Sequence, residues 1–177
     1  ASALSGAYNS SEAMTATAPG REVIVADTPQ AAAARAAERV RAIAAAAVRD
    51  RGVFTLALSG GTTPHPVYEQ LAESALTDEM PWGQTEVFFG DERDVSQDHV
   101  ESNVRMVQRC LLDHVPLAPA QIHPMRGDAD DLPAVADEYE RTVRDLVPAE
   151  GGGARRFDLI LLGMGADGHV ASLFPGT

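Results

Sequence analysis

Phe157–Thr177 (FDLILLGMGADGHVASLFPGT) is the stretch of sequence that decides the fold. Its start, Phe157–Leu162, is mostly apolar and lacks helical periodicity, which predicts a strand buried on both faces. Gly163, Gly165 and Gly168 follow, and glycine permits tight turns and a close approach of the backbone to a ligand. A buried strand that runs into a glycine loop is typical of α/β proteins, which bind ligands at the carboxyl ends of parallel strands.

Two side chains in this loop predict chemistry. Asp167 and His169 flank Gly168, and a neutral imidazole can take a proton from water near physiological pH. The three glycines also match the dinucleotide fingerprint G-x-G-x-x-G. We disfavour that interpretation, because the fingerprint usually follows the first strand of its unit and this strand is the last one present.

Strands and helices are predicted to alternate along the chain. The strands are expected at Glu22–Ala26, Val53–Leu58, Thr85–Phe89, Ile122–Met125 and Phe157–Leu162. The helices are expected at Pro29–Asp50, Pro64–Ser74, Glu101–Asp113 and Leu132–Leu146. This order predicts an α/β fold with a Rossmann-like, mostly parallel sheet and helices on both faces. We expect one domain over residues 21–177, after an unstructured tail or expression remnant over residues 1–20.

A second glycine loop, Ser59-Gly60-Gly61-Thr62-Thr63-Pro64, follows the strand Val53–Leu58. We expect a threonine to cap the next helix, with Pro64 near its first position. Backbone N–H groups at such a turn favour an anion, so Ser59, Gly60, Gly61 and Thr62 are candidates for binding a substrate phosphate. An ordinary strand-to-helix turn remains the alternative for this motif taken alone.

A third loop, Gly90-Asp91-Glu92-Arg93, follows the strand Thr85–Phe89. Three consecutive charged residues can be a solvated loop. If the strands are parallel, however, this loop shares a sheet edge with the two glycine loops. Arg93 can then make a bidentate contact with a phosphate or a carboxylate.

The composition narrows the classes of partner. The formal net charge is −12 and no basic cluster occurs, which argues against nucleic acid and anionic membrane. The single cysteine, Cys110, excludes an internal disulfide and fits a reducing cytoplasm. Outside the loop, His65, His99, His114 and His123 are expected at the surface or at helix ends, and we expect no metal and no cofactor.

Three segments together resemble the 6-phosphogluconolactonase family, whose superfamily includes glucosamine-6-phosphate deaminase. They are LALSGGTTPHPVYEQLA (56–72), VFFGDERDVSQDHVESNVRM (87–106) and GMGADGHVASLFPGT (163–177). The resemblance implies hydrolysis of 6-phosphoglucono-1,5-lactone to 6-phosphogluconate, with a sugar phosphate lactone as the small-molecule partner. A monomer or weak homo-oligomer is expected.

The resemblance also implies roles for individual residues. His169 would be the general base, and Asp167 would fix the loop or contact substrate. Independently of the resemblance, we expect backbone N–H groups around Gly165–Gly168, or at a helix beginning there, to stabilise an oxyanion. Arg93 would contact substrate, Asp91 would orient hydroxyls or side chains, and Asn103 would brace the loop that carries both.

Two alternatives stay open. A deaminase or isomerase of amino-sugar phosphates is disfavoured, because Ala171–Pro175 lacks the glutamate of that branch and Arg93 replaces its tyrosine. A non-catalytic sugar-phosphate-binding module is disfavoured by the presence of Asp91, Asp167 and His169. The resemblance further implies that related enzymes continue past the position of Thr177. We therefore expect an incomplete sheet with an unpaired edge, and no competent enzyme from these residues alone.

Overall fold

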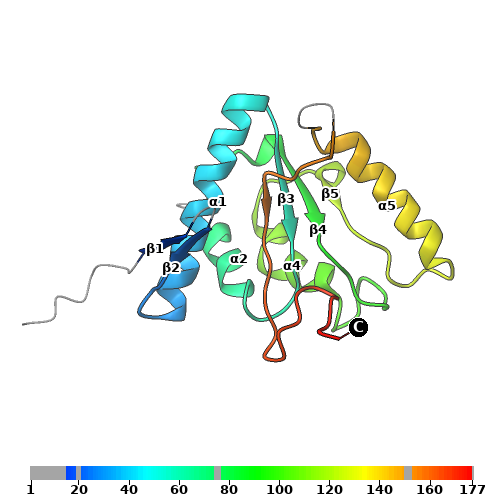
Figure 1. Cartoon of the computed structure of the whole chain (residues 1–177). Coiled ribbons are helices and arrows are strands. Elements are labelled where there is room, and N and C mark those ends of the chain that lie inside the picture. The colour runs from blue at the N-terminus through cyan, green and yellow to red at the C-terminus, as the bar shows by residue number, and fades with distance from the viewer. Residues whose placement is uncertain (1–14, 19–20, 74–76, 150–152, 177) are drawn as a thin grey trace, which may run out of the picture.

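A computed structural model describes residues 15–18, 21–73, 77–149 and 153–176. At its centre lies a parallel sheet with the strand order β5-β4-β3-β6 (Figure 1). Its strands are β3 (Phe54–Leu58), β4 (Thr85–Phe89), β5 (Ile122–His123) and β6 (Leu159–Ile160). This arrangement confirms the predicted Rossmann-like, mostly parallel α/β fold.

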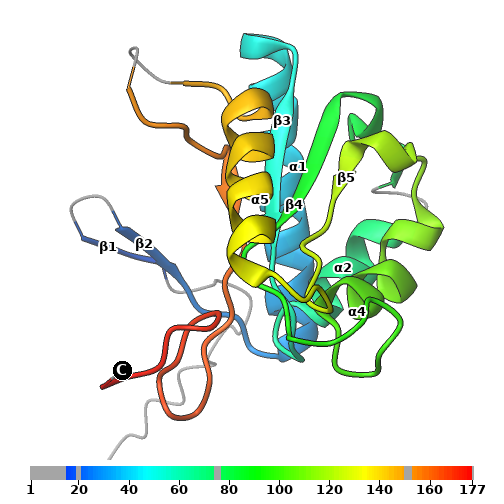
Figure 2. The ribbon, with the colours of Figure 1, turned by 90° about the vertical axis from the view of Figure 1, so that its right-hand side faces the viewer.

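Helices cover both faces of this sheet, as the sequence predicts. One face packs against α1 (Pro29–Arg51), α2 (His65–Ala72) and α4 (Asn103–Cys110). The other face packs against α5 (Leu132–Leu146), which crosses in front of the sheet in Figure 2. Short 3-10 turns occupy Trp82–Gln84, Leu112–His114 and Pro119–Gln121.

The alternation of side chains along β3 and β4 divides the core into two layers. Leu56 and Val87 point into the larger layer under α1, α2 and α4. Ala57 and Phe88 point into the smaller layer under α5, where the Phe88 ring meets the Phe157 ring edge-on at a centroid distance of 5.1 Å. Because both faces are covered, every residue of β3 is buried.

Helix α1 begins at the predicted residue and ends one residue later than predicted. The Thr28 side chain accepts a hydrogen bond from the N–H of Ala31, and Gly52 ends the helix in the left-handed conformation with φ of 78°. The buried positions are Ala33, Ala37, Val40, Ala44 and Ala47, which form one stripe of the helix. Small alanine side chains allow this long helix to pack closely on the sheet.

The first predicted strand does not join the central sheet, which corrects the sequence analysis. Arg21–Ile24 forms β2 and pairs antiparallel with β1 (Thr15–Ala18), in a separate two-stranded sheet. Two residues separate these strands in the sequence, so their pairing closes a short loop at little entropic cost. The predicted tail over residues 1–20 therefore contains a strand, and its remaining residues lie outside the described part of the chain.

Strand β6 is shorter and more exposed than predicted. The ladder covers Leu159–Ile160, and neighbouring bonds run from the N–H of Asp158 to Thr55 and from the N–H of Leu161 to Ala57. Ile160 and Leu162 are 49% and 57% exposed. The prediction of burial on both faces is wrong here, because β6 lies at the edge of the sheet.

The base of β6 is nevertheless tied firmly to β3. The Asp158 carboxylate, whose side chain is 8% exposed, accepts hydrogen bonds from the N–H and the hydroxyl of Thr55 and pairs with Arg51. These contacts fix the register of β6 against β3. Within the described residues, no helix is long and apolar enough to cross a membrane.

Candidate active site

Three loops meet at the carboxyl edge of the sheet, where they enclose an open pocket of about 220 Å³. They follow β3, β4 and β6, which are neighbours in the sheet and run parallel (Figure 1). The predicted site residues that line the pocket are Ser59, Gly60, Gly61, Thr62, Asp91, Arg93, Gly165 and His169. Asp167 and Gly168 are not among the lining residues. The residues that line it without having been predicted are Thr63, Pro64, Gly163, Met164 and Ala171.

The loop after β3 requires glycine at two positions. A Cβ on Gly60 would lie 1.7 Å from Oδ1 of Asn103, so the backbone passes directly over this side chain. Gly61 has φ of 93°, which other residues rarely adopt. The expectation for Ser59 rested on its backbone N–H, which here donates to the hydroxyl of Tyr68, while the Ser59 hydroxyl donates to the carbonyl of Leu161. Its role is to join the loop after β3 to the base of the loop after β6.

Helix α2 starts later than predicted. Pro64 is the N-cap residue, and no side chain caps the helix, so the expected threonine cap is wrong. The reason is that Thr62 and Thr63 form a turn of their own before the helix, whose first bonds run to the carbonyl of Pro64. Thr62 and Thr63 therefore line the pocket.

Asp91, at the end of β4, connects two other parts of the site. Its Oδ1 accepts a hydrogen bond from Nδ2 of Asn103 at 3.1 Å, and its Oδ2 accepts one from the hydroxyl of Ser172 at 2.6 Å. Asn103 also donates to the Asp91 carbonyl at 3.1 Å and is buried. The predicted brace between Asn103 and this loop is therefore present, and Ser172 is a contact that sequence reasoning missed.

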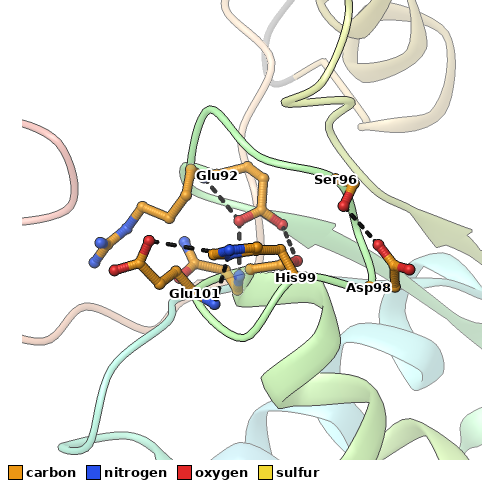
Figure 3. A network of polar contacts seen from close by, with 8 residues as sticks. Glu92, Ser96, Asp98, His99 and Glu101 are labelled. Carbon is orange, nitrogen blue, oxygen red and sulfur yellow. Dashed lines mark hydrogen bonds and ion pairs between the residues drawn. The ribbon is translucent and has the colours of Figure 1, made fainter.

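Glu92 organises the segment between β4 and α4. Its carboxylate accepts hydrogen bonds from the N–H groups of Arg93, Asn103 and Val104, and from the hydroxyl of Ser102 (Figure 3). Two of these N–H groups belong to the first turn of α4, where a negative charge is favourable. The Glu92 carboxylate thus binds protein groups, and it fixes the loop that carries Asp91 and Arg93.

Arg93 is exposed at the mouth of the pocket. Among the residues that the structure describes, no hydrogen bond or ion pair engages its guanidinium group. The side chain also lines an adjoining cavity of about 430 Å³, together with Gly61, Thr62 and His65. An available guanidinium beside a glycine loop is suited to bind an oxyanion.

His169 and Asp167 are in direct contact. Nδ1 of His169 lies 2.5 Å from Oδ1 of Asp167, and the backbone N–H of His169 donates to the same oxygen at 3.2 Å. These two bonds, the backbone one first, hold the pKa of the Asp167 carboxyl below its usual range. With Nδ1–H donated to the carboxylate, Nε2 is left with a lone pair.

The imidazole of His169 is fixed on two further sides. It stacks on Phe174 with a centroid distance of 4.7 Å and an interplanar angle of 28°. A Cβ on Gly165 would lie 2.2 Å from Cε1 of His169, so only glycine leaves room for the ring. The side chain of His169 is 34% exposed, which leaves it accessible from the pocket.

The backbone of this loop is less available than expected. The N–H of Gly165 donates to the carbonyl of His169, and the N–H of Gly168 donates to the carbonyl of Gly165. These two N–H groups therefore already have partners in this conformation, and stabilisation of an oxyanion by the backbone of this loop stays a prediction. Gly168 has φ of 86°, so its contribution is the turn itself.

The remaining histidines lie outside the main pocket. His123 is the exception to the predicted surface positions, because its side chain is 12% exposed, pairs with Glu86 at 2.7 Å and packs on Phe88. Within the described residues, no group of three or more His, Cys, Asp or Glu side chains is arranged to hold a metal ion.

Comparisons with known proteins give the same assignment along most of the chain. Residues 27–177 match the family model described as "Glucosamine-6-phosphate isomerases/6-phosphogluconolactonase". A 6-phosphogluconolactonase from Synechocystis sp. is 50% identical over 131 residues, which cover 74% of this chain and 53% of the relative. A probable chloroplastic 6-phosphogluconolactonase from rice is 37% identical over 161 residues, covering 88% of this chain and 49% of the relative.

Solved structures agree with the sequence matches. The structure of 6-phosphogluconolactonase from Trypanosoma brucei superposes with a TM-score of 0.72 at 30% identity. The match covers 86% of this chain and 63% of that one. The chain thus spans about half the length of the curated relatives that it matches. On the family match, the sequence identities and the shared fold, the chain belongs to the glucosamine-6-phosphate isomerase/6-phosphogluconolactonase family.

Proposed function

We propose that this chain carries the catalytic histidine of a 6-phosphogluconolactonase, which hydrolyses 6-phosphoglucono-1,5-lactone to 6-phosphogluconate. The observation that carries the proposal is the hydrogen bond between Asp167 and Nδ1 of His169. It leaves Nε2 as a base beside a pocket whose other walls are the Ser59–Pro64 loop and Arg93.

Water is the proposed nucleophile. Nε2 of His169 takes a proton from water as the oxygen attacks the lactone carbonyl, and the proton is then available for the ring oxygen as the ester bond breaks. Asp167 stays ionised and stabilises the imidazolium that forms. Proton transfer by such a base typically contributes about 10²- to 10⁴-fold in rate. The lactone is itself electrophilic, so this route needs no covalent intermediate.

The substrate phosphate is proposed to lie against Gly60, Gly61 and Thr62, with the Arg93 guanidinium beside it. The support is the turn before α2 together with a cation that has no partner among the described residues. Asp91 is proposed to orient its neighbours, because both of its carboxylate oxygens accept hydrogen bonds from the protein. This occupancy does not favour the deaminase alternative, in which an aspartate at this place moves protons on carbon.

The test is lactone hydrolysis above the uncatalysed rate. It is measured on the 177-residue chain and, because we expect no competent enzyme from these residues alone, also on a longer protein that contains them. His169→Ala should abolish turnover while binding of 6-phosphogluconate is largely kept. The control is His114→Ala, which removes an exposed histidine whose ring contacts the carbonyl of Arg109. Near-normal turnover of His169→Ala would exclude this histidine as the base, and ammonia release from glucosamine-6-phosphate would favour the deaminase.

We also propose a cytoplasmic protein that is a monomer or a weak homo-oligomer. One cysteine in the whole chain supports a reducing compartment. Cell fractionation tests the location, and sedimentation velocity tests the oligomeric state.

A further inference from the structure

We infer that Ser172 is a positioning residue for His169, acting through Asp91. The inference rests on the proposed function and adds a residue to its machinery. Ser172 lies three positions after His169, at the tip of a tight turn. Its hydroxyl reaches across to the end of β4, where it donates to Oδ2 of Asp91 at 2.6 Å.

The turn that carries Ser172 is held in an unusual conformation. Val170 and Leu173 exchange backbone hydrogen bonds of 3.2 and 3.0 Å, so the two residues between them form the tip. Ala171 has φ of 51°, in the left-handed region that is unfavourable for alanine. Such a conformation persists where surrounding contacts determine it, and it is frequent at functional sites.

The same turn continues directly into the base. Val170 follows His169, and Phe174 on the far side of the turn stacks on the imidazole. His169 is therefore held by a loop whose start is tied to β3, through Ser59 and the Leu161 carbonyl, and whose end is tied to β4 through Ser172. Anchoring at both ends sets the position of the imidazole relative to the other two loops.

Asp91 gains a defined role from this contact. Ser172 occupies Oδ2 and Asn103 occupies Oδ1, while the backbone of Gly60 rests against Asn103. Asp91 thus links all three loops of the pocket. Loss of the Ser172 hydroxyl should release the loop after β6 without altering the chemistry of the imidazole.

The experiment compares Ser172→Ala with wild type in the same protein that is used to test lactone hydrolysis. A hydrogen bond to a charged group supports a loss of about 10-fold in kcat, with a smaller change in KM and an unchanged pH profile. Ser172→Thr keeps a hydroxyl and should recover most of the rate. The matched control is Ser96→Ala, because the Ser96 hydroxyl makes a similar bond of 2.5 Å to Asp98 on the exposed surface of the segment before α4.

A double-mutant cycle tests whether Ser172 acts through its contact with Asp91. Asp91→Asn and Ser172→Ala should be non-additive in kcat and in thermal stability, because they share one contact. Wild-type turnover in Ser172→Ala, or full additivity with no rescue by threonine, would overturn the inference while leaving the proposed function intact. If wild type hydrolyses no lactone even within a longer protein that contains these residues, the proposed function fails. The stability cycle on the 177-residue chain still decides whether Ser172 and Asp91 are coupled.

Discussion

The hydroxyl of Tyr68 is bonded to both backbone groups of Ser59: it accepts from the N–H at 3.0 Å and donates to the carbonyl at 2.8 Å. Tyr139 does the same at the next strand, with bonds of 2.8 and 2.9 Å to the N–H and carbonyl of Phe89. Each tyrosine therefore holds the residue at which a strand gives way to a loop of the site.

Replacing Tyr68 by phenylalanine should destabilise the protein by about 1–3 kcal/mol, because it leaves buried backbone groups of Ser59 without partners. Tyr139→Phe should have a smaller effect, since its ring lies nearer the surface. Burial raises the pKa of Tyr139 to about 12, so its hydroxyl remains a donor across the working range. Urea unfolding measures the stability of both variants. A larger loss of stability for Tyr139→Phe than for Tyr68→Phe would contradict this ranking.

Gly60→Ala should displace Asn103, because the new Cβ would lie 1.7 Å from its Oδ1. We expect a rise in KM for the lactone and a loss of about 1–3 kcal/mol in stability, the usual range for overpacking. Gly83→Ala is the control, since a Cβ there meets no atom within 4 Å. Equal stability of the two variants would argue against the close approach.

Gly165→Ala should act on His169, the proposed base, and not on the Ser59–Pro64 loop. The added Cβ would lie 2.2 Å from Cε1 of His169, so the imidazole must move out of its bond with Asp167. We expect kcat to fall at least 10-fold with little change in binding of 6-phosphogluconate. Kinetics measures kcat and calorimetry measures binding of 6-phosphogluconate on the same preparation. A loss of binding with unchanged kcat would contradict the prediction that Gly165 makes room for His169.

Acid should break the hydrogen bonds between His169 and Asp167, and it should do so only at a pH below the ordinary aspartate pKa. The backbone and imidazole bonds of His169 depress the pKa of the folded Asp167 carboxyl. A depressed pKa stabilises the loop above the unfolded pKa, and this contribution disappears as the pH falls through the lower, folded value. Carbon-detected NMR should place the Asp167 midpoint below that of an ordinary aspartate, about 3.9. An ordinary midpoint would mean that the two bonds are not maintained in solution.

Much of the α/β fold could be predicted from short stretches of the sequence. The largely apolar run Val53–Leu58 predicted β3, and alanine-rich periodicity predicted α1, because these signals act within a few residues. The pairing of β2 with β1 and the exposure of the β6 side chains could not be predicted from the sequence. Both depend on which strand lies beside which, and an apolar run does not specify its neighbour.

For the site, the sequence by itself determined the three loops, the candidate base and the glycines, since each motif follows a strand directly. Only the tertiary structure decided the partners: Asp167 with His169, Asn103 beneath Gly60, and Ser172 with Asp91. Ser172 and Asp91 are 81 positions apart in the chain. Such contacts arise when parallel strands bring their carboxyl ends to one edge, and no local pattern encodes the distance between them.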